Sequence, residues 1–299
     1  MRRFLMRSFI VLAILLVIWV ILAPGCMTFR KPDNEMKAKF KEAGVSLKTE
    51  TFQIEDRNIH YAKTGEDSLP TLVFIHGTPG SWDAFAGYLQ NKELLSRYRM
   101  ISIDRPGFGY SDFGKALHLA PQAILLNEAV KKLRNGKPIY LVGHSLGGPM
   151  VVLMAADNPE YYNGVVLISG SVDALEEKPE KWRPLLFKTP LNYLVPGAFK
   201  PSNEELWYLK KDLVALKDEF TKISSPVYFI HGRKDTWVPP GNVDYAKKLL
   251  VNSPRIDELY FADGNHFIPW TKFNAIKNVL LGLDSAYNAM GGQKLAKAR

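Results

Sequence analysis

The sequence predicts an α/β fold, in which helices cover both faces of a mostly parallel central sheet. Short apolar runs bounded by Gly, Pro and Asp recur along the chain, and helix-like segments alternate with them. Because these runs are almost continuously apolar, they are typical of parallel strands that are buried on both faces. With 299 residues, of which 46% are hydrophobic, the chain is long enough for one large domain of this kind.

The first 26 residues predict a signal or membrane-anchor segment. Three arginines among the first seven residues precede an uninterrupted apolar run over residues 9–23. Cys26, the only cysteine, follows Gly25 and resembles the lipid-modified cysteine of a bacterial lipoprotein signal. A lipidated Cys26 and an uncleaved anchor with an incidental cysteine both remain open. In either case we expect the protein to be anchored in a membrane, with the catalytic domain outside the cytoplasm.

The rest of the chain divides into a core, an insertion and two flanking segments. Residues 49–54 and 58–62 predict an antiparallel hairpin that opens the core. A segment rich in Trp, Tyr, Leu and Pro lacks a clear strand, and a structureless loop of that length is uncommon, so we interpret it as a helical cap over the crevice. An ordinary surface excursion is the alternative. The expected divisions are a spacer (27–48), a core in two parts (49–170 and 224–284), the cap (171–223) and a flexible tail (285–299).

Ser145 is the expected nucleophile. It lies in the stretch Gly143-His144-Ser145-Leu146-Gly147, which follows an apolar strand and precedes a helical run over residues 146–156. The small residues two positions before and after the serine allow a sharp turn that exposes its hydroxyl, and the N–H of the next residue faces the attacked carbonyl.

A serine hydroxyl needs a base to accept its proton and an acid to orient that base. Asp235 lies in the turn after the apolar run at 227–230, and His266 follows the run at 258–261. Asp173, shortly after another apolar run, is the alternative acid. The remaining histidines are expected to have structural roles or have no evident acid partner; these are His60, His76, His118, His144 and His231.

The chain order of Ser145, Asp235 and His266 resembles that of the α/β-hydrolase family. Two further segments resemble loops of this family, His-Gly-Thr-Pro-Gly at 76–80 and Asp-Arg-Pro-Gly-Phe-Gly-Tyr-Ser at 104–111. The resemblance extends over residues 49–283. It implies that Ser145 is the nucleophile, His266 the general base and Asp235 the orienting acid, with the N–H groups of Thr78 and Leu146 as the oxyanion hole.

The resemblance also implies an activity. We expect a serine hydrolase that cleaves a carboxylic ester of a small or medium apolar substrate through an acyl-enzyme. An aminopeptidase that removes N-terminal proline is one alternative, because residues 76–82 are similar to its entry loop, although that family places Trp where Leu146 stands. A ligand-binding protein without turnover is another. Dehalogenases and epoxide hydrolases use an aspartate at the turn, so Ser145 disfavours both.

Composition argues against other function classes. The formal net charge is +9, but the basic residues are spread over the chain. The sequence contains no nucleic-acid module signature, phosphate-binding loop or zinc-ligand spacing. We therefore expect a small-molecule ester as substrate, membrane contact through the N-terminal segment, and no cofactor, metal or nucleic-acid partner. The oligomeric state does not follow from the sequence.

Overall fold

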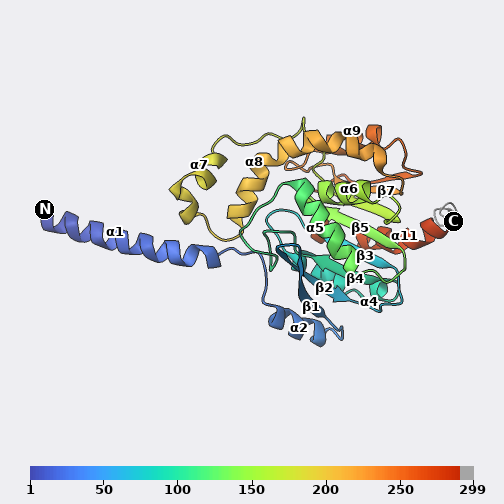
Figure 1. The fold of residues 1–299 in the computed structure, drawn as a ribbon, viewed down its shortest axis with the longest axis horizontal. Coiled ribbons are helices and arrows are strands. Elements are labelled where there is room, and N and C mark those ends of the chain that lie inside the picture. Colours follow the sequence, from blue (N-terminus) through green and yellow to red (C-terminus); the bar gives the residue numbers. More distant parts are fainter. Residues whose placement is uncertain (290–299) are drawn as a thin grey trace.

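The computed structural model describes residues 1–289 and contains one eight-stranded sheet with the order β1-β2-β4-β3-β5-β6-β7-β8 (Figure 1). The six strands from β3 to β8 are parallel, and β1 and β2 form an antiparallel hairpin at one edge. The mostly parallel sheet expected from the alternating pattern is confirmed. The strands are β1 (Lys48–Ile54), β2 (Arg57–Thr64), β3 (Thr71–Ile75), β4 (Arg99–Ile103), β5 (Ile139–His144), β6 (Gly164–Ile168), β7 (Val227–Gly232) and β8 (Ile256–Phe261).

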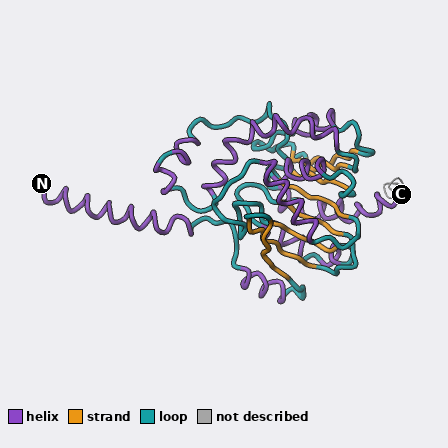
Figure 2. The backbone as a smooth tube through the Cα atoms, viewed as in Figure 1, coloured by secondary structure: helices purple, strands orange, loops and turns teal. Residues whose placement is uncertain are grey.

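Helices cover both faces of this sheet (Figure 2). Successive side chains of a strand point to opposite faces, so Val73 and Ile75 of β3 belong to one apolar cluster, and Leu72 and Phe74 belong to the other. The first cluster includes residues of α5 (Leu119–Lys132), α6 (Gly147–Asp157) and α9 (Gly241–Leu249). The second includes residues of α2 (Asp33–Glu42), η2 (Trp82–Phe85), α3 (Ala86–Leu89), α4 (Lys92–Leu95), α10 (Ile268–Thr271) and α11 (Phe273–Ala289).

A helical cap lies between β6 and β7. It consists of α7 (Arg183–Lys188), η3 (Pro190–Leu194), α8 (Phe199–Leu216) and η4 (Lys217–Lys222). Leu209, Leu213 and Leu216 of α8 are buried against the first cluster, so this end of the cap is part of the core packing. The α7 end lies farther from the sheet, on the side from which α1 (Arg2–Leu22) projects (Figure 1).

The helix α1 is long and apolar enough to cross a membrane, although a signal sequence would pass the same test. A short turn, η1 (Ala23–Gly25), follows it. The structure corrects the expectation of a spacer over residues 27–48, because this segment packs on the core. Met36 and Phe40, four residues apart on α2, are fully buried. Their spacing of four residues indicates one buried helix face, but the segment is otherwise polar in composition and therefore resembles a spacer.

The expected tail also begins too early. Helix α11 continues through residue 285 to Ala289, the last residue that the structure describes, and the sequence has no glycine or proline after Gly282 within this range. The remainder of the expected tail, residues 290–299, lies outside the described residues.

Candidate active site

Ser145 lies on a sharp turn between β5 and α6. Its φ of 55° is in the left-handed region that side chains rarely adopt. Glycine is required two positions before and after Ser145 for steric reasons. A Cβ on Gly143 would lie 2.2 Å from the carbonyl oxygen of Gly147. A Cβ on Gly147 would lie 2.1 Å from the carbonyl oxygen of Ile75. The sequence thus forms a nucleophile elbow, a turn that holds the serine in a strained conformation.

The loop after β3 lies directly against this elbow. A Cβ on Gly77 would lie 2.8 Å from Cβ of Ser145, so only glycine permits so close an approach. Thr78 follows and lines the same cavity as Leu146, the residue after the serine. Within residues 1–289, neither of these two backbone N–H groups donates a hydrogen bond to the protein. The Thr78 hydroxyl is also buried without a partner. These groups are therefore free to donate hydrogen bonds to a ligand in the cavity.

His266 and Asp235 are joined by a hydrogen bond. The Nδ1–H group of His266 donates to Oδ2 of Asp235 at 2.8 Å. Asp235 follows β7, and its other carboxylate oxygen accepts from the backbone N–H groups of Trp237 at 3.0 Å and Val238 at 2.9 Å. Burial is the largest single influence and acts to raise the pKa of Asp235, but the hydrogen bond from His266, the charge of that ring, the hydrogen bond from Val238 and the nearby Ser169 hydroxyl together outweigh it, so the pKa is lowered. With Nδ1 donating to a carboxylate, the neutral ring has its lone pair on Nε2.

Asp173 is not part of this arrangement. Its Oδ1 accepts from the backbone N–H of Leu175 at 2.8 Å, and its own N–H donates to the side chain of Asn242. The structure therefore brings His266 together with Asp235, and it places the alternative acid in a local turn.

The other histidines near the site make structural contacts. His144 donates from Nε2 to the carbonyl oxygen of His266 at 3.1 Å, and His231 donates to that of Val238 at 2.9 Å. Burial, followed by the neighbouring His266, lowers the pKa of His144 to about 3. Burial, followed by the charge of Arg105, lowers the pKa of His76. These rings are therefore neutral at physiological pH and add no positive charge near Ser145.

Asp104 supports the loop after β4. Its carboxylate accepts from the backbone N–H groups of Trp82 at 2.6 Å and Tyr110 at 2.8 Å. Complete burial raises the pKa of Asp104 to about 8. A Cβ on Gly109 would lie 2.1 Å from the Asp104 side chain, which explains why this turn contains glycine. Asp104 therefore holds its own loop and is not a second acid for His266.

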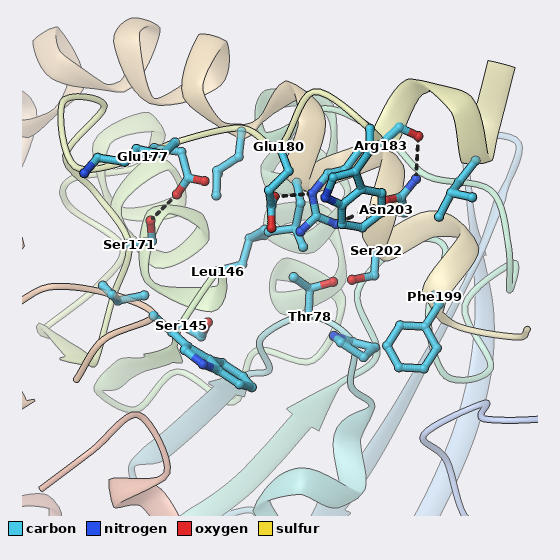
Figure 3. A pocket seen from close by; sticks show the side chains of 18 of the residues that line it. Thr78, Ser145, Leu146, Ser171, Glu177, Glu180, Arg183, Phe199, Ser202 and Asn203 are labelled. Atoms are coloured by element: carbon cyan, nitrogen blue, oxygen red, sulfur yellow. Dashed lines mark hydrogen bonds and ion pairs between the residues drawn. The ribbon is translucent and has the colours of Figure 1, made fainter. Parts of the chain in front are cut away.

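Ser145 and His266 line one cavity of about 890 Å³ between the core and the cap (Figure 3). Thr78 and Ser145 lie at its floor, and residues of the cap lie above and beside them. Most of the cap side is apolar, with Leu186, Leu191, Leu194, Val195, Pro196, Phe199, Leu206 and Leu209. A polar part contains Ser171, Glu176, Glu177, Lys178, Glu180, Arg183, Ser202 and Asn203. Such an arrangement suits a substrate with an apolar portion and a polar portion.

A buried ion pair that the sequence analysis did not identify joins the cap to the loop after β4 and, through the same arginine, to the loop after β3. Arg105 binds both carboxylate oxygens of Glu205 on α8, at 2.8 and 2.9 Å. It also donates to the carbonyl oxygens of His76 at 3.0 Å and Gly77 at 3.1 Å. The side chains of Arg105 and Glu205 are 0% and 2% exposed. One side chain therefore positions the cap relative to the expected oxyanion loop.

A signal for this pair was present in the sequence. Glu205 lies four and eight residues before Leu209 and Leu213, on the same face of α8. A carboxylate on an apolar helix face indicates a buried partner of opposite charge. The identity of that partner, in a loop 100 residues away, does not follow from the helix pattern.

Comparison with known proteins supports the same family. Residues 70–206 match the model described as alpha/beta hydrolase fold. A 2-hydroxy-6-oxononadienedioate/2-hydroxy-6-oxononatrienedioate hydrolase of Burkholderia vietnamiensis is 26% identical, and the alignment covers 75% of this chain and 89% of that protein. The monoglyceride lipase of Mus musculus is 30% identical over 42% of this chain and 43% of the lipase.

Solved structures share the fold. The crystal structure of a membrane phospholipase A, described as a bacterial virulence factor, matches with a TM-score of 0.62 and 20% sequence identity. That match covers 96% of this chain and 99% of the phospholipase chain. At this level of identity the likeness establishes the architecture and leaves the substrate open.

Proposed function

The chain belongs to the α/β-hydrolase fold family, and we propose that it is a serine hydrolase that cleaves carboxylic esters through an acyl-enzyme. The observation that carries the proposal is the hydrogen bond from His266 to Asp235, in a cavity that also contains Ser145 on its strained turn. A base that is oriented by a carboxylate, in the same cavity as a serine on a strained turn, is the arrangement that nucleophilic acyl transfer requires.

Each residue has one role in the proposed reaction. His266 accepts the proton of Ser145 while the hydroxyl oxygen attacks the ester carbonyl carbon. The N–H groups of Thr78 and Leu146 bind the resulting oxyanion. The imidazolium, stabilised by Asp235, then protonates the leaving alcohol, and a water molecule repeats the sequence to release the acid. Losing one oxyanion donor in such a site costs about 3 kcal/mol of transition-state stabilisation.

Cleavage of a carbon–carbon bond is the second candidate, because the Burkholderia relative is a hydrolase of a dienedioate. A dicarboxylate substrate needs unpaired cations in the cavity. Here Arg183 donates to Glu180 at 2.6 Å and to Asn203 at 3.1 Å, so its charge is already compensated, which leaves Lys178 as the one lining cation without an acidic partner among the described residues. Glu176 and Glu177 also line the cavity. This distribution of charge favours a neutral ester over a dianion.

The test is a comparison of substrates on the full-length protein. p-Nitrophenyl esters of rising chain length are compared with proline p-nitroanilide, and the Ser145→Ala variant is the control. We expect ester hydrolysis that exceeds proline release and falls by at least 10³-fold in the variant. Faster proline release would support the aminopeptidase alternative instead. A folded wild type with no Ser145-dependent turnover would support a binding protein.

A further inference from the structure

The N-terminal segment is attached to the cap. The indole N–H of Trp19, near the end of α1, donates to the carbonyl oxygen of Leu194 at 2.9 Å. The N–H of Gly197 donates to the carbonyl oxygen of Ala23 at 2.9 Å. Where the segment leaves the cap, the hydroxyl of Ser81 donates to the carbonyl oxygen of Phe29 at 2.7 Å. The point where α1 ends is therefore fixed relative to both cap and core.

Both expected fates of the N-terminus, an uncleaved anchor and a lipidated Cys26, would place a membrane at this point. As an intact helix, α1 has 21 residues and a length of about 30 Å, sufficient to cross the hydrocarbon layer. After cleavage and lipidation, the acyl chains would start from Cys26. This residue also lies against the cap, because a Cβ on Gly197 would lie 2.0 Å from the Cys26 carbonyl oxygen. The cap would thus face the bilayer in either case.

The cap presents apolar side chains on its outer surface near this point. We define the cap edge as five side chains of residues 182–199 that are more than one third exposed: Trp182, Leu185, Leu191, Tyr193 and Phe199. Leu185 is 56% exposed and Tyr193 is 63% exposed. Phe199 packs edge-on against Phe29, with ring centroids 5.3 Å apart, which makes the cap edge continuous with the N-terminal segment. Aromatic side chains of this kind are enriched at membrane interfaces.

The same stretch carries positive charge. Between residues 181 and 203 the sequence has four basic residues, Lys181, Arg183, Lys188 and Lys200, and no acidic residue. Only Arg183 has an acidic partner, Glu180, in the part of the chain that the structure describes. Basic residues around an apolar surface match the anionic headgroup layer of a membrane.

The cavity reaches this surface. Trp182, Leu191 and Phe199 belong both to the cap edge and to the cavity wall, and Figure 3 shows Phe199 at one side of the cavity, away from Ser145. A substrate that leaves the bilayer at the cap edge would therefore meet the apolar cap side of the cavity before it reaches the serine. The cavity of about 890 Å³ is near the upper end of small-molecule sites, which are ~300–1,000 Å³.

We propose that the cap edge lies in the membrane interface and that the substrate is a single-chain acyl ester of a polar alcohol, taken directly from the bilayer. This inference rests on the proposed ester hydrolase. It replaces the expected small or medium ester with an amphiphile whose chain enters between α7 and α8 and whose ester reaches Ser145.

The test uses full-length protein in vesicles of phosphatidylcholine and phosphatidylglycerol that contain 1-monooleoylglycerol. p-Nitrophenyl butyrate, dissolved in water, is the comparison substrate. The test variant, Leu185→Glu with Tyr193→Glu, changes two exposed side chains of the cap edge that do not line the cavity. The matched control is Val251→Glu. Val251 is 70% exposed and precedes β8, at the amino ends of the strands, whereas Ser145 and the cavity lie at their carboxyl ends.

We expect the double variant to hydrolyse monooleoylglycerol at least tenfold more slowly than wild type, with butyrate hydrolysis unchanged within twofold. Val251→Glu should leave both rates unchanged. The inference is overturned if the double variant retains the wild-type rate in vesicles, or if Val251→Glu loses as much. It is also overturned if wild type cleaves butyrate but not monooleoylglycerol. Failure of the proposed function differs, because butyrate hydrolysis would then be absent or independent of Ser145.

Discussion

The two sides of the cavity are built in different ways. On the core side, the backbone segments of the elbow and the adjoining loop lie so close together that only glycine fits at Gly77, Gly143 and Gly147, and His266 and Asp235 are joined by a direct hydrogen bond. On the cap side, apolar side chains from short helices surround a wide space and several of them are exposed. The core side is therefore suited to fixed chemistry. The cap side is suited to selection among substrates, and a change of sequence there alters specificity before it alters reactivity.

The largest expected effect separates the two candidate acids. Asp235→Asn removes the charge that stabilises the imidazolium of His266, and kcat should fall about 10⁴-fold. Asp173→Asn should change kcat less than threefold, because Asp173 holds only a local turn. Both are measured with p-nitrophenyl butyrate at pH 7. A larger loss in the Asp173 variant would reverse the assignment.

The next effect concerns the Arg105–Glu205 ion pair, which connects the core side of the cavity to the cap side. Arg105→Met leaves Glu205 buried without its partner, which should lower the free energy of unfolding by about 3–5 kcal/mol. The double variant Arg105→Met with Glu205→Leu removes both charges and should recover part of this loss. Urea denaturation of the full-length protein in detergent, followed by circular dichroism, measures both. If the single and double variants are equally stable, the ion pair does not hold the cap.

A smaller effect should appear in the cap alone. Leu206 lines the apolar part of the cavity, so Leu206→Trp shortens the space available to an acyl chain. We expect about a tenfold lower kcat/KM for long p-nitrophenyl esters, and little change for the acetate, since a few lost methylene contacts are worth about 1–3 kcal/mol. A uniform loss over all chain lengths would show that this part of the cap acts on chemistry as well.

The last effect is a pH dependence of stability on the core side. Because the pKa of buried His144 is about 3, the unfolded chain binds a proton between pH 3 and about 6.5 that the folded protein does not. The free energy of unfolding should therefore fall as the pH is lowered through this window, by about 1.4 kcal/mol per unit for this group. His144→Gln should make the slope shallower by this amount. An unchanged slope would mean that His144 is protonated in the folded protein.

The same contrast explains what could be predicted from the sequence. The elbow, the order of Ser145, Asp235 and His266, and the parallel sheet all follow from local patterns, because strands and their carboxyl-end turns have short, characteristic sequences. The pairing of Arg105 with Glu205 and the packing of Phe29 on Phe199 join segments 100 and 170 residues apart. Local periodicity in the sequence does not indicate such long-range contacts. The attachment of the N-terminal segment to the cap could therefore be seen only in the structure.

The most direct test of the central claim is covalent labelling of the serine. A fluorophosphonate reacts with a serine that a neighbouring base has activated, and mass spectrometry of the digested protein locates the adduct. We predict one adduct per chain, on the peptide that contains Ser145, with labelling at least 100-fold slower in His266→Ala. A folded wild-type protein that stays unlabelled, or equal labelling without His266, would contradict the account.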